Sequence, residues 1–173
     1  MTYVQPCRTR RARRRGFTLF EAALATVIVG LGVLGVMQLL AVTTAQNRGG
    51  NQLTTAMYLA QCIQEAMADL PFNDPSGAGF GLEEQGGLLT WNDIDDFHGF
   101  TTLGSSPIDA RRQPLTGLDQ YAQHVTVVEV SPNNLALALP GADAKRVTVV
   151  ITYRRLPTDT PAEVYRTSWI RTR

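Results

Sequence analysis

A single glutamate and a group of three aspartates in this sequence lie where their surroundings could give them a chemical role. The first is Glu21, the only charged residue in a long apolar run over residues 17–42. A carboxylate in apolar surroundings is costly unless a cation or hydrogen-bond donors satisfy it, so Glu21 predicts a specific partner. The second set is a group of three aspartates in the stretch WNDIDDFHG at positions 91–99, namely Asp93, Asp95 and Asp96.

Calcium is the ligand that the aspartate group would suit. Ca²⁺ prefers oxygen ligands, which acidic loops supply at alternate positions, so Asp93, Asp95 and Asp96 are candidate calcium ligands. The complete EF-hand pattern is missing, because no glycine stands at the sixth position and no glutamate closes the loop. The alternative is a solvated acidic turn whose aromatic residues, Trp91 and Phe97, pack inward. We expect no other metal and no organic cofactor.

The chain contains residue types that can catalyse reactions, but their spacing does not arrange them for catalysis. His98 and His124 lack the spacing of a metal-ligand pair. Ser105 and Ser106 lack the flanking glycines of a hydrolase nucleophile, and the sequence has no glycine-rich phosphate loop. We therefore expect a protein that is not an enzyme.

The apolar run is long enough to cross a membrane. As a helix, residues 17–42 would span about 40 Å at ~1.5 Å per residue, more than the ~30 Å hydrocarbon core of a bilayer. A secretory signal has a shorter apolar region that ends in a small-residue cleavage site, so the apolar run does not fit a secretory signal. Gly30, Gly32 and Gly35 lie within the run and would permit close helix packing. The arginines upstream would hold the N-terminus in the cytoplasm, so the remaining chain is expected on the periplasmic side of the inner membrane.

Charge is divided unevenly along the chain. Six arginines and no acid precede Gly16, and the residues after it carry 10 basic and 15 acidic side chains, a formal charge of −5. An acidic body argues against a nucleic-acid partner, because binding to phosphates needs clustered Lys and Arg. The basic pairs of the body are expected on the solvated surface: Arg111 and Arg112, Lys145 and Arg146, Arg154 and Arg155.

Glu21 also has a purely local interpretation. The sequence TLFE at positions 18–21 fits a capping box, in which Thr18 caps the helix and Glu21 reaches back to the Thr18 amide. An acid in the first turn also suits the helix dipole. A cap alone, however, does not account for the arginine-rich leader, for Gly16 and Phe17, or for the apolar run that follows.

The sequence RRRGFTLFE at positions 13–21, together with the apolar run, resembles the class III leader of type IV prepilins. The resemblance covers residues 10–42. It implies that prepilin peptidase cleaves after Gly16, that the new N-terminal residue Phe17 is methylated, and that Glu21 pairs with the N-terminal amine of a neighbouring subunit. The implied partners are prepilin peptidase, other pilin subunits contacted through the N-terminal helix, and the inner membrane. The pilus at the cell surface is the implied destination.

The leading interpretation is a structural minor pilin that enters a type IV pilus or primes its assembly and contributes to adhesion. The stretch DDFHG at positions 95–99 is similar to one in minor pilins of the mannose-sensitive haemagglutinin type. A pseudopilin of a type II secretion system would share every N-terminal feature. A membrane-anchored binding module or enzyme that is never processed is a third interpretation. Removal of the leader would take Cys7 away and leave Cys62 without an intrachain partner, so we expect a buried thiol there, with an intersubunit disulfide as the alternative.

The resemblance and the residue pattern separately predict an α+β fold, with a long N-terminal hydrophobic helix and a small antiparallel β-sheet head. After the leader at residues 1–16 and the helix at 17–42, we expect an amphipathic helical continuation over 43–72, a loop-rich region over 73–120 and the sheet over 121–173. The apolar stripe of the continuation comprises Leu53, Met57, Ala60, Ile63, Met67 and Leu70. Alternating β-branched residues predict strands at 123–130, 135–139, 145–154 and 163–171.

Overall fold

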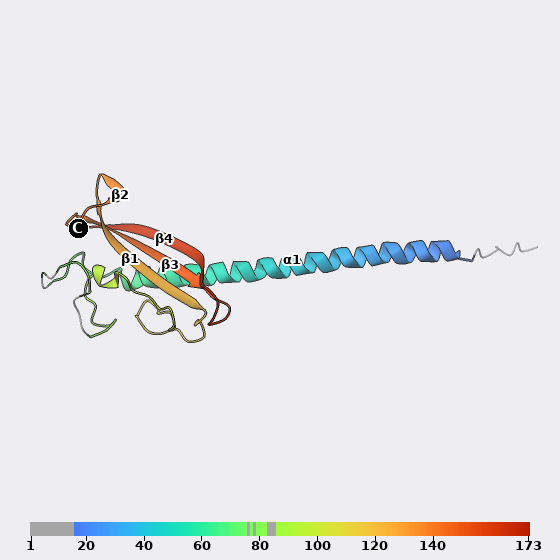
Figure 1. Cartoon of the computed structure of the whole chain (residues 1–173), viewed down its shortest axis with the longest axis horizontal. Coiled ribbons are helices and arrows are strands. Elements are labelled where there is room, and N and C mark those ends of the chain that lie inside the picture. Colours follow the sequence, from blue (N-terminus) through green and yellow to red (C-terminus); the bar gives the residue numbers. More distant parts are fainter. Residues whose placement is uncertain (1–15, 76, 78, 83–85) are drawn as a thin grey trace, which may run out of the picture. The chain divides into compact units, whose positions relative to one another are not determined.

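The computed structural model describes residues 16–75, 77, 79–82 and 86–173, so the leader up to residue 15, with Cys7, lies outside the described residues. Its elements are α1 (Leu19–Ala66), the short 3₁₀ helix η1 (Asp95–Phe97), β1 (Tyr121–Ser131), β2 (Asn134–Ala138), β3 (Ala144–Tyr153) and β4 (Ala162–Thr172) (Figure 1). The predicted α+β, pilin-like fold is confirmed, since a long N-terminal apolar helix is followed by an antiparallel sheet. The chain divides into two units, Met1–Asn47 and Arg48–Arg173.

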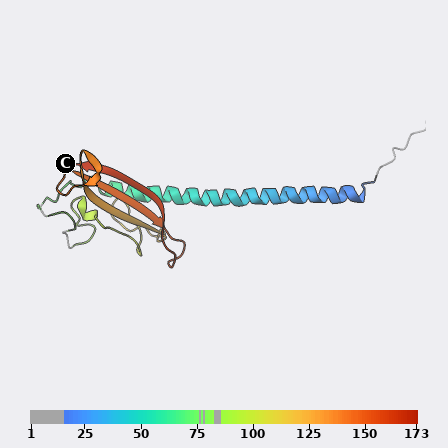
Figure 2. The same ribbon diagram turned by 45° about the horizontal axis from the view of Figure 1, so that its top comes forward.

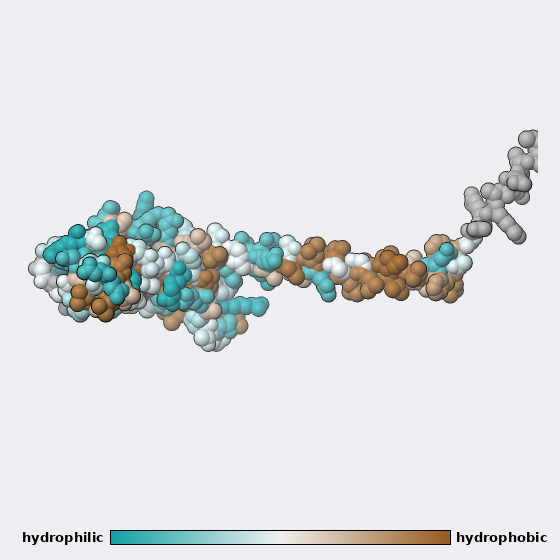
Figure 3. Space-filling model, turned by 90° about the horizontal axis from the view of Figure 1, so that it is seen from above, coloured by the Kyte–Doolittle hydropathy of each residue, from teal (hydrophilic) through white to brown (hydrophobic). Residues whose placement is uncertain are grey.

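The first unit contains the apolar part of α1. All of its described residues are exposed, including large apolar side chains such as Phe20 and Leu39. Its threonine hydroxyls bond within the helix; Thr26 Oγ1, for example, donates to the Ala22 carbonyl at 2.8 Å, which satisfies a polar group on an apolar surface. Apolar side chains cover this part of α1 (Figure 3). Within the described range, α1 is the one helix long and apolar enough to cross a membrane, by length and composition.

In the second unit, one face of the end of α1 packs into the core. Its buried side chains recur every three or four residues, as an amphipathic helix requires, and are Ala56, Leu59, Ala60, Cys62, Ile63 and Ala66. The predicted stripe was wrong at its start, because Leu53 and Met57 are 43% and 48% exposed. The packed face is rotated around the helix and begins at Ala56. The predicted burial of Cys62 is confirmed.

The strands form one antiparallel sheet in the order β2-β1-β3-β4 (Figure 2). The register sets Val127 opposite Val147, and Val147 opposite Trp169. Because successive residues of a strand point to opposite faces, one face of β1 and β3 collects the apolar side chains. These residues are buried in one cluster with the side chains of α1: Val125, Val127, Val147, Val149 and Ile151. The apolar face predicted for β3 is therefore confirmed.

The region between α1 and β1 has little regular structure but is well packed. The rings of Trp91 and Phe97 meet edge to face with centroids 4.8 Å apart, and Phe100 lies 5.5 Å from Trp91 and 5.9 Å from Phe97. Such aromatic pairs add to the stabilisation from burial. The predicted inward packing of Trp91 and Phe97 is confirmed, because both are buried in the core.

A buried amide joins helix, sheet and connecting region. The Gln123 side chain is fully buried on β1. Its Nε2 donates to the carbonyls of Leu59 and Ile108 at 3.0 Å each, and its Oε1 accepts the Ile108 amide at 2.8 Å. A buried amide satisfied on both ends adds specificity, because any other arrangement would leave its polar atoms unpaired.

Replacement of Phe97 by Ala should strongly destabilise the second unit, since it removes a fully buried ring from the aromatic cluster. We expect a loss of about 3–5 kcal/mol in the free energy of unfolding, measured by urea denaturation of the full chain in detergent. Leu103→Ala in the same region is the control, because Leu103 is 48% exposed. It should change the free energy by no more than about 0.5 kcal/mol. Equal losses in the two variants would contradict the packing described above.

Candidate functional site

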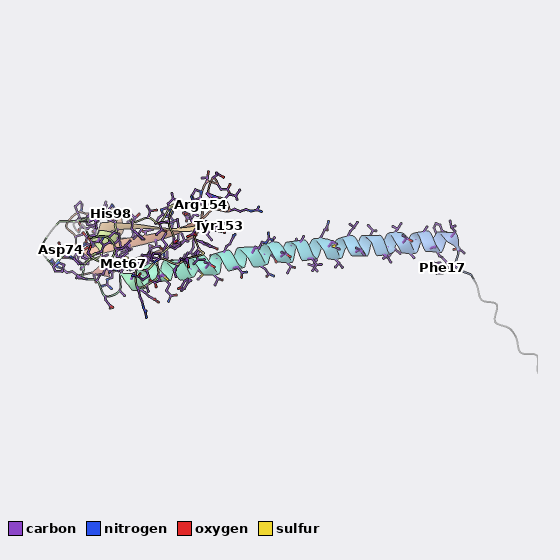
Figure 4. All side chains as sticks on the ribbon, turned by 90° about the horizontal axis from the view of Figure 1, so that it is seen from below. Phe17, Met67, Asp74, His98, Tyr153 and Arg154 are labelled. Atoms are coloured by element: carbon purple, nitrogen blue, oxygen red, sulfur yellow. The ribbon has the colours of Figure 1, made fainter. Side chains whose placement is uncertain are left out.

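The predicted processing junction lies immediately before α1. Gly16 and Phe17 have no regular secondary structure, the helix begins at Leu19, and Phe17 is exposed (Figure 4). The bond between Gly16 and Phe17 is thus not enclosed in secondary structure. An exposed backbone outside regular secondary structure is where peptidases cleave most readily.

Thr18 and Glu21 form a reciprocal capping box at the start of α1. Glu21 Oε2 accepts the Thr18 amide and the Thr18 hydroxyl, both at 2.9 Å, while Thr18 Oγ1 accepts the Glu21 amide at 3.2 Å. The predicted local role of Glu21 is therefore confirmed. Within the described residues Glu21 has no cationic partner.

The three aspartates of the second candidate set lie together and are buried. Asp93, Asp95 and Asp96 are each about 1% exposed, so the prediction of a solvated acidic turn is wrong. The turn folds back on itself instead. Asp93 Oδ1 accepts the amides of Asp95 and Asp96 at 3.0 and 3.1 Å, and Asp96 Oδ2 accepts the amides of Asn92 and Asp93 at 2.7 and 3.1 Å. Backbone amides thus replace the water that these carboxylates lose on burial.

Asp95 has a different partner. Its Oδ1 pairs with the ammonium group of Lys145, and its Oδ2 accepts the Gly81 amide at 2.9 Å. Lys145 also donates to the carbonyl of Phe72, and its Nζ lies 4.6 Å from the centroid of the Phe72 ring. This one ammonium group therefore connects β3, η1 and the segment that follows α1.

Arg112 is the second cation beside the turn. Its guanidinium donates to the carbonyls of Leu88 and Trp91 at 3.0 and 2.8 Å and to that of Ala66, the last residue of α1, at 3.3 Å. The guanidinium also lies 5.4 Å from the Phe97 ring centroid. A cation at a helix C-terminus offsets the partial negative charge of its unpaired carbonyls, so Arg112 holds the end of α1 and the connecting region together.

Sequence reasoning placed Lys145 and Arg112 on the solvated surface, and both predictions are wrong. The signal for Lys145 was present, because Lys145 shares its strand face with Val147, Val149 and Ile151, all fully buried. Arg112 gave no comparable signal. It adopts a positive φ of 62°, which is uncommon for a residue with a side chain, and only the folded connecting region defines what its guanidinium reaches.

The geometry of the aspartates does not assemble a metal site. No group of three His, Cys, Asp or Glu side chains in the described part of the chain is placed to hold a metal ion. Asp93 and Asp96 use an oxygen each on backbone amides, and Asp95 pairs with Lys145. We therefore do not assign these residues as metal ligands, and calcium binding stays a prediction from sequence.

The remaining polar candidates are separated and engaged in structural bonds. His98 Nδ1 accepts the Val127 amide at 3.2 Å, and the His124 ring lies 2.9 Å from the Thr101 hydroxyl. Ser106 donates to Asp119 at 2.6 Å. The two histidine contacts tie connecting segments to β1, the Ser106 contact lies within the connecting region, and none of them brings the histidines and serines into one site.

Asp93 should make stability depend on pH. Burial is the main cause that raises the pKa of Asp93, to about 7. The hydrogen bond from the Asp96 amide lowers this pKa, and the negative charge of Asp95 raises it. The folded protein then binds more protons than the unfolded chain between pH ~4 and pH ~7, so stability falls as pH rises through this window, by up to about 1.4 kcal/mol per pH unit. Asp93→Asn should flatten this slope and be more stable than wild type at pH 8, measured by urea denaturation from pH 4 to pH 8.

The matched control is Asp159→Asn, because Asp159 also accepts a backbone amide in a turn but is exposed. It should keep the wild-type slope. An Asp93→Asn variant with the wild-type dependence on pH would contradict the shifted pKa.

Comparison with protein-family models, with curated proteins and with solved structures found no match for this chain. The pilin-like layout is thus defined by the elements themselves, a long apolar helix followed by a small antiparallel sheet.

Proposed function

We propose that this chain is a minor pilin, a structural subunit that enters a type IV pilus or primes its assembly and contributes to adhesion, with the mannose-sensitive haemagglutinin type as its subgroup. In this proposal the chain is inserted in the inner membrane with its head in the periplasm. Prepilin peptidase cuts after Gly16, Phe17 is methylated, and the subunit then joins the filament at the cell surface.

The observation that carries the proposal is the start of α1. An exposed apolar helix begins within three residues of Gly16, and its only acid over residues 17–42 is held by the Thr18 cap. In a single subunit, the cap supplies hydrogen bonds to the Glu21 carboxylate but no charge. In a filament, the N-terminal amine of a neighbouring Phe17 would supply the charge. Pairing would then favour one register of neighbouring helices over all others, because every other register leaves a carboxylate unpaired in apolar surroundings.

The exposed apolar surface of α1 supports the same role. Large side chains from Phe17 to Val42 are more than half exposed, so they need cover from lipid or from other helices. A helix that is first surrounded by lipid and later by other helices keeps its apolar surface covered in both settings. The partners expected from this surface are other pilin subunits, packed in an open, heterologous assembly. The acidic body after Gly16 offers no favourable surface to nucleic acid.

The first test is the N-terminal residue of the protein extracted from membranes, identified by mass spectrometry of its first peptide. We expect a methylated Phe17. An intact N-terminus, from cells with an active prepilin peptidase, would contradict the proposal and favour an unprocessed membrane-anchored module.

To separate the pilus from a secretion system, surface pili and protein secretion should be compared after deletion of the gene. Loss of pili with normal secretion is the expected result, and the reverse would indicate a pseudopilin.

Two substitutions of Glu21 separate its charge from its cap. Glu21→Ala loses both, whereas Glu21→Gln keeps a side chain that can cap the helix but carries no charge. We expect both variants to be processed normally and both to be poorly incorporated, by at least about tenfold, in sheared filaments quantified by immunoblot. Glu65→Gln is the control, because Glu65 is exposed on the same helix in the second unit. Normal incorporation of Glu21→Gln would show that the cap alone matters and would overturn the proposed amine pairing.

A further inference from the structure

A pocket in the second unit lies between the loop that follows β3 and the turns that precede β1. Its volume is about 320 Å³, within the ~300–1,000 Å³ range typical of sites for small ligands. One side comprises four consecutive residues, Arg154, Arg155, Leu156 and Pro157, and the other includes Asp119 and Gln120. The Arg154 amide donates to the Gln120 carbonyl at 2.8 Å, so the two sides are fixed to each other.

The two arginines of this pocket are accessible cations. Arg154 is half-buried and Arg155 is exposed, so a ligand can reach both side chains. Neither guanidinium forms an ion pair with a carboxylate in the part of the chain that the structure describes. Two adjacent guanidiniums without acidic partners suit an anion, and their N–H groups match the oxygens of a phosphate.

The positive charge of the pocket is a local exception in an acidic unit. Two arginines line the pocket against one acid, Asp119, which already accepts the Ser106 hydroxyl at 2.6 Å. The second unit as a whole contains 10 basic and 14 acidic residues. An anionic surface would therefore repel most of this unit and attract it at the pocket.

An exposed leucine follows the arginines in the same loop. Leu156 is 55% exposed, and its amide donates to Asp159 Oδ2 at 3.0 Å. The Asp159 amide donates back to the Leu156 carbonyl at 3.0 Å, so the loop is closed into a turn that presents Leu156. An apolar side chain beside guanidiniums suits a lipid–water interface, where the apolar group meets acyl chains and the cations meet phosphates. A phosphate ion in water would make no use of the leucine.

The chain between the apolar run and the second unit is short. Val42 and Arg48 are six positions apart, so the chain between them extends by no more than about 20 Å in any conformation. With the apolar run in a bilayer, the headgroup layer of ~5–8 Å on each side narrows this gap further. The end of the second unit that holds Arg48 therefore lies close to the membrane surface.

The pocket lies toward that end of the second unit. The Tyr121 side chain lies beside Thr55, which is seven positions after Arg48 on α1. Tyr121 pairs with Tyr153, the last residue of β3, and the arginine loop begins at the next residue. Figure 4 shows Tyr153 and Arg154 at one end of this unit and Asp74 at the other.

We propose that this pocket binds the phosphate group of an anionic phospholipid in the periplasmic leaflet, with Arg154 and Arg155 as donors and Leu156 at the boundary of the acyl chains. The contact holds this end of the second unit on the membrane surface. The inference rests on the proposed insertion of α1 in the inner membrane, but not on cleavage, methylation or entry into a pilus.

The test is amide hydrogen exchange of the full chain in nanodiscs, followed by mass spectrometry of the peptide that covers residues 154–161. One set of discs contains phosphatidylcholine alone, and the other contains an equal mixture of phosphatidylcholine and phosphatidylglycerol. We expect exchange in this peptide to be at least about fivefold slower in the mixed discs, because each arginine near an anionic surface is attracted to it. In ~1 M salt, where the Debye length is ~3 Å, the difference should disappear.

Variants locate the effect. The double variant Arg154→Gln and Arg155→Gln should lose the difference between the two discs, and Leu156→Ser should reduce it. The double variant Arg111→Gln and Arg173→Gln is the matched control, because it removes the same charge from exposed arginines outside the pocket. It should keep the difference found for the wild-type chain.

Three results would overturn the proposal. The first is equal exchange of the wild-type chain in the two discs. The second is a double variant of Arg154 and Arg155 that keeps the difference. The third is equally slow exchange in phosphatidylcholine discs with added inorganic phosphate, because the pocket would then be a site for the free anion. If the double variant fails to fold, as judged by near-ultraviolet circular dichroism, Leu156→Ser decides.

The same experiment separates this inference from the proposed function on which it rests. A chain that does not elute with discs of either composition would contradict both the membrane anchor and the lipid site. A chain that elutes with both discs, and whose exchange does not depend on phosphatidylglycerol, would contradict the lipid site alone.

Discussion

The ammonium group of Lys145 is the interaction on which the arrangement of the second unit depends. The Lys145 side chain is almost fully buried, and a buried charge is tolerated only where its partners replace the lost water. Lys145 satisfies this constraint with Asp95 on η1 and with the Phe72 carbonyl after α1. The connecting region must therefore adopt the one conformation that brings both groups to β3. Gln123 and Arg112 impose similar constraints, because each satisfies carbonyl groups from other parts of the fold.

Glu21 presents the same constraint in the other unit. The Thr18 cap gives its carboxylate two donors, but a cap leaves the negative charge in place. In the second unit the matching cations are built into the chain. At the start of α1, no described cation pairs with Glu21. The carboxylate of Asp95 thus has a cation within its own unit, whereas that of Glu21 has hydrogen-bond donors but no described cation.

The elements of the fold could be predicted from sequence because their signals are local. The apolar run located α1, the TLFE sequence located its cap, and alternation located the strand ends to within two residues. The burial of the acidic turn could not be predicted. The amides bound by Asp93 and Asp96 are local, but the cation that pairs with Asp95 and the core that covers the turn are brought together only by the fold. The helix stripe was misplaced at Leu53 and Met57 because several apolar positions fit a helical period, and only packing selects among them.

The bonds that close the second unit join residues far apart in the chain. Lys145 and Phe72 are separated by 73 positions, and Arg171 donates to the Leu70 carbonyl across 101. Folding slows as such non-local contacts become more important, because chain entropy is lost before the contacts form. The segment just after α1 is held by a side chain on β4, so this bond forms only once β4 has been synthesised. During synthesis, the second unit can therefore close around this segment only after β4 has left the ribosome.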